Sequence, residues 1–440
     1  MRRLEGVAEA PVLRPDGTIL ELPGYDSATG FLFAPNAPFL PVLAKPSQAD
    51  ARCACDELRE LVHEFPFAGE AHFSAFLAAL LTPLVRGALS GPVPGFLFDA
   101  NTRGTGKGLL ADLIAIILTG RVLARMTMPV EDAELRKVLF ALALEGEQLV
   151  LMDEARVLSG AALDAVLTGT RLKDRILSES KNGEAPILFT LYFAGNNVQV
   201  KGDTVRRILP VRLESSLERP EERTGFTHPD LRAWARKERP RLHRAALTIL
   251  RAYCAAGRPA VDVRQWGSYE EWSDLVRRAL VWAGAPDPCS SRAELTDSDT
   301  DLLLLKQLIA GLEELGGGPM SVRDMLAKLD RDHLAGPTMR AALAELDGDK
   351  PSSKTVGNKL RKFRGRIADG KRLESVPDRN GVGIWRVTAA GSAGCAGSLS
   401  NPHAREWQGE EDKKSGGSRS DAPQTPHTPH SSTGDAPEGR

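Results

Sequence analysis

The segment at residues 96–110 constrains the fold of this chain more than any other stretch of its sequence. It begins with a short apolar run, continues through the turn Gly104-Thr105-Gly106-Lys107, and ends in the apolar start of a helix. A strand, a glycine-rich turn with one lysine and a helix N-terminus are the parts of a phosphate-binding loop, in which backbone N–H groups hold the phosphate and the lysine reaches its terminal oxygens. Gly108 stands where the usual pattern has a magnesium-binding hydroxyl, so the motif alone is an incomplete match.

The composition is that of a globular protein without an overall attraction to polyanions. The 440 residues suffice for two or three domains, and the formal net charge is −1, so a nucleic-acid surface would have to be a local patch. The five cysteines are scattered, and Cys53-Ala54-Cys55 has no second Cys or His pair at zinc spacing, so we expect free thiols in a reducing cytoplasm. The longest nearly apolar run, residues 73–85, is too short to cross a bilayer, and we expect neither a secretory signal nor a membrane partner.

Short apolar stretches alternate with helical patterns between residues 94 and 214. The predicted strands are 95–98, 122–126, 148–152, 187–193 and 208–213, and helices begin at Gly106 and Glu131. Alternation of this kind predicts a mainly parallel sheet with helices on both faces, which is an α/β core of ordinary domain size.

The remaining sequence divides into segments of distinct composition. Pro15-Asp16-Gly17 predicts a hairpin turn, Ser47 is suited to cap the helix that follows it, and residues 228–290 contain helical patterns only. We therefore predict an extended or hairpin segment at 1–46, a helical linker at 47–90, the α/β core at 91–215, a helical lid-like domain at 216–297, a DNA-binding domain at 298–390 and a disordered tail at 391–440.

An acidic pair follows the strand predicted at 148–152. Asp153 and Glu154 come directly after four apolar residues, and the carboxyl ends of parallel strands form the rim where open α/β sheets bind ligands. Hydrolysis of ATP needs one carboxylate for the Mg²⁺ shell and often a second to polarise water, which are the roles that we assign to Asp153 and Glu154. Without Lys107 upstream, the simpler interpretation that the pair caps the next helix would be preferred.

Two further motifs follow in the order that this chemistry requires. The strand predicted at 187–193 leads to Asn196, a buried amide at the strand end that could hold the attacking water, although Gly-Asn-Asn is also ordinary turn chemistry. Arg206 and Arg207 precede the last strand, and either could stabilise charge on the transferred phosphoryl group, usually across a subunit boundary. Surface ion pairing is the alternative for these arginines.

With these motifs in this order, residues 95–214 resemble AAA+ ATPases, and within them the superfamily 3 helicases and the helicase half of plasmid- or phage-type, poxvirus-like primase-helicases. The resemblance is carried by Gly104-Thr105-Gly106-Lys107, Leu151-Met152-Asp153-Glu154, Ala194-Gly195-Asn196-Asn197 and Asp203-Thr204-Val205-Arg206-Arg207. It implies an AAA+ P-loop core that binds ATP and Mg²⁺ in a homo-oligomeric ring, a hexamer. It also implies ATP binding by Gly104, Thr105, Gly106, Lys107 and Gly108, a metal ligand at Asp153, and catalytic roles for Glu154, Asn196, Arg206 and Arg207.

Helicases of this kind carry a basic hairpin that projects into the central pore. Here the interval 170–184 contains Lys173 and Lys181, and Asn182-Gly183 is a strong signal for a hairpin turn. The resemblance therefore implies that a ring of such lysines grips single-strand phosphates. A solvated surface hairpin is the alternative.

The C-terminal helix predicted at 355–367 can be interpreted without the family. Val356, Leu360, Phe363 and Ile367 recur at helical spacing and predict one buried face. Helices followed by a two-stranded ribbon, at 372–376 and 383–387, are the plan of a winged helix-turn-helix, and a basic helix beside a wing is typical of duplex recognition. The candidate DNA-binding residues are Lys359, Arg361, Lys362, Arg364 and Arg366, with a merely solvated basic face as the alternative.

The function predicted from these features is that of an ATP-dependent DNA helicase in the replication of a phage, plasmid or integrated element. Its partners would be single-stranded DNA, duplex DNA and a primase on a separate chain, since residues 1–90 offer no polymerase metal site. The alternatives are an ATP-binding, DNA-binding switch such as a replication initiator or loader, and a degenerate core that has lost catalysis. Gly108 is the best support for the degenerate core, whereas the intact acidic pair argues against it.

Overall fold

A five-stranded parallel sheet forms the centre of the structure, a computed structural model that describes residues 4–176, 181–293, 295, 300–348, 351–377 and 381–390. Its strands stand in the order β12-β6-β11-β8-β7, and every neighbouring pair is parallel. They are β6 (Gly95–Ala100), β7 (Arg125–Thr127), β8 (Leu149–Leu158), β11 (Thr190–Val200) and β12 (Ile208–Leu213). The five predicted strands are confirmed, although β7 is short and β8 and β11 run further than the sequence suggested.

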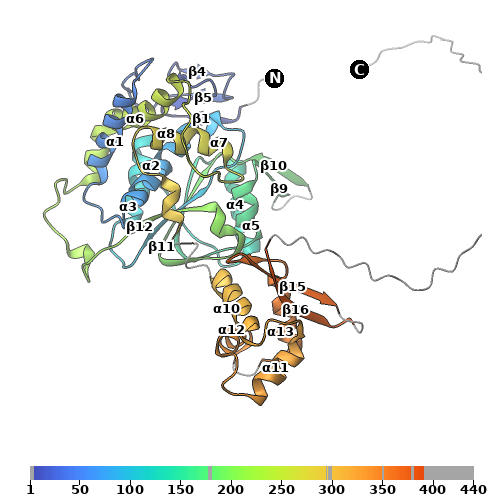
Figure 1. Ribbon diagram of the computed structural model, residues 1–440. Helices are drawn as coiled ribbons and strands as arrows, with labels where there is room; N and C mark the ends of the chain where they lie inside the picture. The colour runs from blue at the N-terminus through green and yellow to red at the C-terminus, as the bar shows by residue number, and fades with distance from the viewer. Residues whose placement is uncertain are drawn as a thin grey trace, which may run out of the picture. The chain divides into compact units, whose positions relative to one another are not determined.

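Helices cover both faces of this sheet (Figure 1). The first face carries α2 (Glu70–Val85), α3 (Lys107–Thr119) and α6 (Leu231–Ala255), with α1 (Gln48–Val62) packed on α6, and the second carries α4 (Asp132–Glu145) and α5 (Ala161–Thr168). Alternate side chains of a strand point to opposite faces, so Phe96 and Phe98 join the core of the first face whereas Leu97 joins that of the second. Burial on both faces explains why these strands are almost continuously apolar.

Local signals set the first two helices. Ser47 caps α1 as predicted, because its Oγ accepts from the backbone N–H of Asp50 at 3.2 Å while the Asp50 carboxylate accepts from the backbone N–H of Ser47 at 2.7 Å. The next helical stretch, Glu70–Ala88, has the length and apolar composition of a membrane span, yet 78% of its most apolar window is buried inside the protein. It is the central core helix of the first face.

Two arginines of α6 fasten it to α3, the helix that follows the glycine-rich loop. Arg232 donates from Nε and Nη2 to Asp112 Oδ2, at 2.9 and 2.7 Å. Arg239 is buried and donates to the carbonyl oxygens of Ile117, at 3.1 Å, and Leu118, at 2.8 Å, near the end of α3. A cation at a helix C-terminus satisfies carbonyls that have no partner within the helix and opposes the helix dipole. Helix α6 thus holds the loop helix at its middle and near its C-terminal end.

Short strands and helices complete this part of the chain. The small N-terminal sheet pairs β1 (Gly6–Ala8), β5 (Phe31–Phe33) and β4 (Gly24–Tyr25), and β2 (Val12–Leu13) and β3 (Ile19–Leu20) form the predicted hairpin. Gly17 has a φ of 82° in its turn, a conformation that favours glycine. After α6, the chain forms α7 (Glu270–Trp272), one π-helical turn (Ser273–Arg277) and α8 (Arg278–Trp282).

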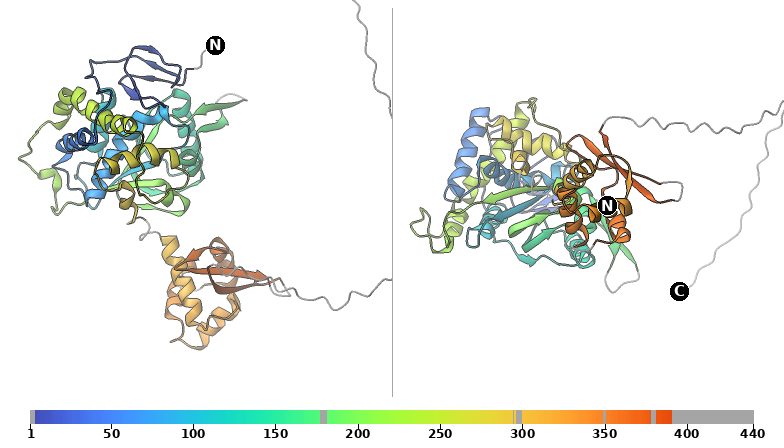
Figure 2. Two further views of the ribbon diagram at one scale, coloured as in Figure 1. Left: turned by 45° about the horizontal axis from the view of Figure 1, so that its top comes forward. Right: turned by 60° about the horizontal axis from the view of Figure 1, so that its bottom comes forward.

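A separate two-stranded ribbon, β9 (Arg171–Arg175) with β10 (Asn182–Pro186), projects from the second face beside α4 (Figure 2). The predicted hairpin is therefore present, but the predicted turn at Asn182-Gly183 is wrong. Asn182 pairs with Arg175 and Gly183 with Asp174, so both residues belong to a strand and the connection includes residues 177–180, which lie outside the described part of the chain. A turn at Asn182-Gly183 would start the second strand at Glu184, whereas the antiparallel pairing starts β10 two residues earlier, at Asn182.

Residues 300–390 form a module with its own apolar core. It contains α10 (Thr300–Glu314), α11 (Val322–Arg331), α12 (Pro337–Asp347) and α13 (Ser353–Leu360), and a sheet in the order β13 (Met320–Ser321), β16 (Gly383–Ala389), β15 (Lys371–Pro377), β14 (Ile367–Ala368). The sequence predicted these helices and the β15–β16 ribbon, whereas the winged helix-turn-helix itself stays a prediction. The connection between the two strands of the ribbon includes residues 378–380, and these residues and the tail predicted at 391–440 fall outside the described part of the chain.

The last predicted helix ends earlier than expected. After α13 a single 3₁₀ turn covers Arg361–Phe363, and Ile367 then begins β14. Val356, Leu360 and Phe363 are buried as predicted, but Ile367 is 48% exposed. Arg364 leaves the helical conformation with a ψ of 127°, and Gly365 follows with a φ of 77°, which lets the chain turn into the sheet.

Candidate nucleotide site and nucleic-acid interface

The glycine-rich loop joins the end of β6 to the first turn of α3, as predicted. Gly104 and Gly106 have φ values of 77° and 96°, so the loop makes two left-handed turns that favour glycine, and α3 begins at Lys107. Asn101 anchors the other end of the loop, because its side chain donates to the carbonyl of Ser215 at 2.9 Å and accepts from the N–H of Ser215 at 3.1 Å. A helix N-terminus behind a glycine turn is a ready anion site.

The ammonium group of Lys107 lies among oxygen atoms. Its Nζ donates to Asn196 Oδ1 at 2.7 Å, to Thr105 Oγ1 at 3.3 Å and to the carbonyl of Thr102 at 3.4 Å. Partial burial lowers the pKa of Lys107, while the nearby carboxylates, foremost that of Asp99, act in the opposite direction. The amine thus lies in front of the loop, where it can bind an anion that displaces its present partners.

The acidic pair lies inside a strand rather than at its end. Strand β8 continues to Leu158, and Glu154 interrupts it with a φ of 58°, which is uncommon for a residue that is not glycine. The backbone N–H of Glu154 donates to Asp153 Oδ1 at 2.9 Å. Asp153 pairs in register with Thr127 of β7, and both carboxylates are close enough to oppose the lowering of the Lys107 pKa by burial, so the predicted acids and lysine share one site.

A bulge in β11 carries Asn196 to the lysine. Gly195 pairs with Ala155 of β8, and the next pair is Gln199 with Val157, so three residues of β11 stand opposite a single residue of β8. Bulges occur beside active sites because they redirect a side chain. The sequence predicted a buried amide at a strand end, but Asn196 is exposed and reaches Lys107 from the bulge. Gly195 is required there, since a Cβ would overlap the carbonyl oxygen of Ala155 and Cγ2 of Val198.

Two residues that the sequence reasoning missed support this bulge. Asp99 of β6 is 6% exposed and accepts from Arg212 Nη1 at 2.6 Å and from the backbone N–H of Val198 at 3.1 Å. Arg212 Nη2 also donates to Asn197 Oδ1 at 3.4 Å. Burial raises the pKa of Asp99, and its hydrogen bond with Val198 and the charge of Arg212 work in the opposite direction. The sequence signal for this pair was Asp99 itself, the one acid within the apolar strand β6, because a buried carboxylate needs a partner.

The two adjacent arginines differ in their surroundings. Arg207 is buried and forms an ion pair with Asp164 of α5. Arg206 is exposed and forms an ion pair at 3.0 Å with Asp203, three residues away, and its own carbonyl accepts from Trp266 Nε1 at 2.8 Å. Of the two candidates, Arg206 is therefore the one whose guanidinium is free to reach another molecule.

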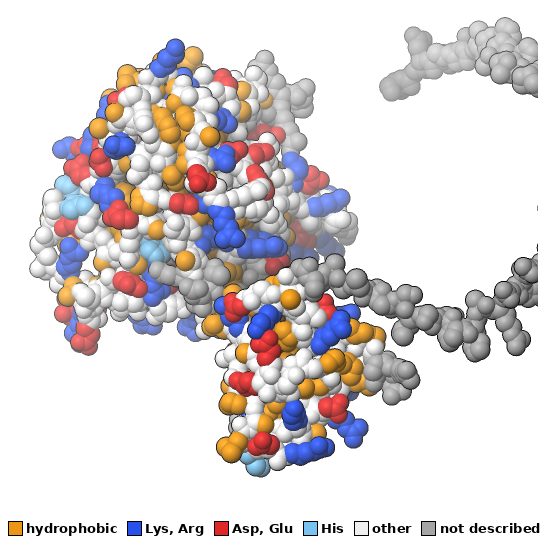
Figure 3. All heavy atoms as spheres, viewed as in Figure 1, with side chains coloured by type: hydrophobic (Ala, Val, Ile, Leu, Met, Phe, Trp, Pro, Cys, Tyr) orange, Lys and Arg blue, Asp and Glu red, His pale blue; other side chains and the backbone are white. Residues whose placement is uncertain are grey.

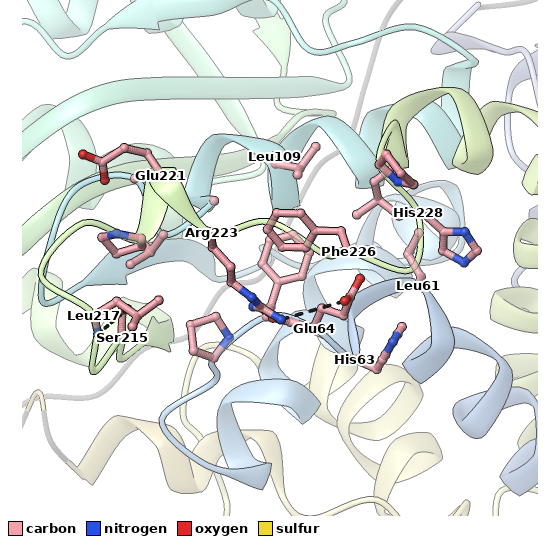
Figure 4. A pocket seen from close by; sticks show the side chains of 18 of the residues that line it. Leu61, His63, Glu64, Leu109, Ser215, Leu217, Glu221, Arg223, Phe226 and His228 are labelled. Atoms are coloured by element: carbon pink, nitrogen blue, oxygen red, sulfur yellow. Dashed lines mark hydrogen bonds and ion pairs between the residues drawn. The ribbon is translucent and has the colours of Figure 1, made fainter.

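A cavity of about 600 Å³ adjoins the loop (Figure 4). Its walls come from the end of α1 with the residues after it, from the loop itself, and from the segment at 214–232. Arg223 reaches toward Glu64, with a charged pair at 3.8 Å and a 2.7 Å bond to the Glu64 carbonyl, and Phe226 adds an apolar surface. No sequence pattern indicates this pocket, because its walls lie far apart along the chain. Its volume and mixed lining suit a flat heterocycle beside a phosphate loop.

The predicted DNA-binding lysines of the ribbon are accessible. Lys173 lies on β9 opposite Glu184, and Lys181 directly precedes β10. The ribbon also bears Arg171, which forms an ion pair with Glu184, so its charge is partly neutralised. Its lysines can contact a polyanion without rearrangement of the sheet.

The basic residues of the C-terminal module are less free than the sequence suggested. Lys359 donates to the Asp347 carboxylate at 3.1 Å, and Lys362 forms an ion pair with Asp301 at 2.7 Å. On the face that Figure 3 shows, acidic and basic side chains of this module are interspersed. Arg361 and Arg364 are exposed, and Arg366 lies over the Phe363 ring at 5.6 Å. A contact with duplex DNA stays a prediction, and within this set it depends most on the three arginines.

Comparisons with known proteins give limited similarity. No family model matches the sequence, and no curated protein sequence matches it significantly. The A form apo structure of the NrS-1 C-terminal region is similar over 82% of this chain and 80% of that chain, with a TM-score of 0.42 and 14% identity. The JCV helicase is similar over 57% of this chain and 72% of that chain, with a TM-score of 0.22 and 14% identity. At such scores the likeness establishes no family, and function has to be inferred from the residues of this chain.

The donor set fits ATP with Mg²⁺. The loop offers backbone N–H groups at a helix N-terminus and one cation, Lys107, for phosphate oxygens. Across from it, Asp153 and Glu154 offer carboxylate oxygens, and the residues that the structure describes include no group of three or more His, Cys, Asp or Glu arranged to hold a metal ion. Mg²⁺ is usually held by one or two carboxylates together with substrate phosphates, so a sparse acidic site of this kind suits it.

Proposed function

We propose that this chain is an ATPase that drives movement along DNA, that is, an ATP-dependent helicase. The observation that carries the proposal is the meeting of Lys107, the acidic pair and Asn196 in front of a glycine-rich loop, brought there by three neighbouring strands of a parallel sheet. The lysine, acids and amide are the groups needed to bind a nucleoside triphosphate and to direct water at its terminal phosphate.

The residues divide this work by position. Lys107 and the loop N–H groups would hold the β- and γ-phosphates, and Asp153 would ligate Mg²⁺, which neutralises phosphate charge when it is bound. Glu154 would accept the proton of the attacking water, and Asn196, released from Lys107 by the incoming phosphate, would orient that water. The cavity beside the loop would take the purine, and Arg206 would act in the site of a neighbouring subunit.

Movement along DNA would be transmitted by the β9–β10 ribbon. The ribbon projects from the second face beside α4, and its lysines would bind single-strand phosphates in a homo-oligomeric ring. Phosphate contacts of this kind carry no sequence information, as a translocating motor requires.

A second candidate is an ATP-binding switch, such as a replication initiator or loader, that binds DNA without unwinding it. The observation that favours it is Gly108, which supplies no hydroxyl to the metal, so hydrolysis would be slow. The switch and the motor share the nucleotide site and differ in whether single-stranded DNA speeds turnover.

The deciding experiment measures ATP turnover with and without single-stranded DNA for the wild-type chain and for Lys107→Ala and Glu154→Gln. We expect DNA to stimulate the wild type and each substitution to reduce turnover at least about a hundredfold, as loss of a group that acts on the transferred phosphate does. Lys137→Ala and Glu134→Gln are matched controls, because these residues form an exposed ion pair on α4 at 2.6 Å. Equal, DNA-independent turnover in all five proteins would refute the motor. Turnover that depends on Lys107 but ignores DNA would favour the switch.

A further inference from the structure

Glycine at position 108 is not explained by the backbone of the loop. Gly108 is the second residue of α3, and its φ is not positive, so any residue could adopt its conformation. Glycine inside a helix is less favourable than alanine. A reason other than backbone freedom must therefore account for the absence of a side chain.

The space that a side chain would fill is occupied by Arg125. A Cβ at Gly108 would lie 2.8 Å from Nη2, 3.3 Å from Cζ and 3.6 Å from Nη1 of Arg125, and these are the three nearest atoms. The hydroxyl of the usual loop pattern would extend from that Cβ. The guanidinium therefore stands in the volume that the serine or threonine side chain takes in the usual loop.

Arg125 is held by a buried carboxylate, and its side chain is partly open to solvent. It begins β7, where it pairs with Leu151 two residues before Asp153, and its Nη2 donates to Asp112 Oδ2 at 3.3 Å. Asp112 lies one helical turn after Gly108, so it is on the same side of α3. The Arg125 side chain is 48% exposed, whereas that of Asp112 is 4% exposed.

The charge of this cluster is unbalanced in favour of an anion. The same oxygen of Asp112 also accepts both bonds from Arg232, so one carboxylate serves two guanidinium groups. The cluster thus carries one excess positive charge beside the first turn of the loop helix. Guanidinium groups donate several hydrogen bonds in a plane and bind phosphate oxygens well.

We propose that Arg125 binds the phosphates of the nucleotide and that Gly108 exists to admit it. The guanidinium takes the place of the missing hydroxyl and supplies directly to the phosphate oxygens part of the positive charge that Mg²⁺ otherwise supplies. Nucleotide binding by this site consequently depends less on the metal than in the usual loop. This inference rests on the proposed nucleotide site and assigns to it a residue that the loop motif does not contain.

The test is the binding of a fluorescent ADP analogue to the full chain, in Mg²⁺ and in EDTA, followed by anisotropy. We expect the wild type to bind in EDTA, and Arg125→Met to lose about tenfold or more in EDTA, the worth of one charge-assisted hydrogen bond, with a smaller loss in Mg²⁺. Arg121→Met is the matched control, because Arg121 is exposed and pairs with Glu9 through its carboxylate. The Arg121→Met variant loses one positive charge, as Arg125→Met does, and should bind the ADP analogue like the wild type.

A second variant tests the link between the two positions. Gly108→Ser alone should weaken binding in both buffers, since the new side chain meets the guanidinium. Gly108→Ser combined with Arg125→Met should bind more tightly than Gly108→Ser in Mg²⁺ and should depend strongly on Mg²⁺. Urea unfolding of each variant reports whether Arg125 acts only by holding Asp112 in place.

The outcomes separate the inference from the proposed function. Equal EDTA affinity of Arg125→Met and the wild type, or strictly additive effects in the double variant, would overturn the role of Arg125 alone. If Arg125→Met loses stability but keeps its affinity for the ADP analogue in EDTA, the role of Arg125 in binding would also be overturned, because the contact with Asp112 would then be purely structural. A wild-type chain that binds nucleotide in neither buffer would contradict the proposed function and the inference together.

Discussion

Replacing Asp99 by alanine tests whether a buried carboxylate holds the β11 bulge in place. Asp99 is 6% exposed, and the substitution removes the partner of Arg212 at 2.6 Å and the acceptor of the Val198 N–H at 3.1 Å. Breaking a buried ion pair costs roughly 3–5 kcal/mol, and leaving a buried N–H without an acceptor about 1–3 kcal/mol. The Arg212 side chain is 24% exposed and also donates to Glu214 at 3.1 Å, so it can turn toward water and a second partner. We therefore expect the free energy of unfolding to fall by about 3 kcal/mol, the low end of these costs.

The assay combines urea unfolding with ATP turnover. Asp99→Asn keeps an acceptor for the Val198 N–H and should lose about half as much stability, because only the charge is removed. Asp99→Leu together with Arg212→Met leaves no unpaired charge, so its loss of stability should be confined to the roughly 1–3 kcal/mol of a Val198 N–H without an acceptor. Turnover should nevertheless stay low in the double variant, since nothing fixes the bulge that carries Asn196. Wild-type unfolding of Asp99→Ala, or full turnover in the double variant, would refute the reasoning.

The remaining predictions concern the bulge glycine and a buried histidine. Gly195→Ala should cost about 1–3 kcal/mol and most of the turnover, because its Cβ would overlap Ala155 and Val198, whereas Gly69→Ala, with no atom within 4 Å and an extended backbone, should stay within about 0.5 kcal/mol. Equal unfolding midpoints for these two variants would contradict the bulge geometry. Burial lowers the pKa of His243 from 6.5 to about 3. Below pH 6.5 the unfolded chain therefore binds a proton that the folded chain does not, and the free energy of unfolding falls as the pH drops from 6.5 toward 3. Between pH 6.5 and pH 5 this loss should reach about 2 kcal/mol in urea titrations and should be absent in His243→Phe, and an unchanged pH profile in that variant would exclude the histidine as its source.

The sequence by itself determined those features that depend on neighbours along the chain. The strand, glycine turn and helix at 96–110, the cap at Ser47, and the alternation of apolar strands with helices were predicted and are present. The spacing of Val356, Leu360 and Phe363 also identified a buried helix face. Such features follow from local periodicity and capping, which act within one or two turns of the backbone.

Local signals failed where another segment competes for the same residues. Asn182-Gly183 is a hairpin-turn sequence, yet pairing with β9 draws it into a strand, and Ile367 leaves the helical pattern because it begins β14. The exposed position of Asn196 has the same origin, since the bulge exists only relative to the register of β8. A hydrophobic pattern fixes which face of a strand is buried, but it does not fix where a partner strand interrupts it.

Only the tertiary structure decided how the candidate site is supported. Asp99 and Arg212 lie 113 residues apart in sequence, and the register of β6 with β12 makes them direct partners. Arg125 reaches Gly108 because the edge strand of the sheet passes beside the loop helix. The loop lysine and the acidic pair could be read from motifs because each motif consists of consecutive residues. Their supporting charges could not, because a contact between distant segments depends on strand register and helix packing, which no local pattern specifies.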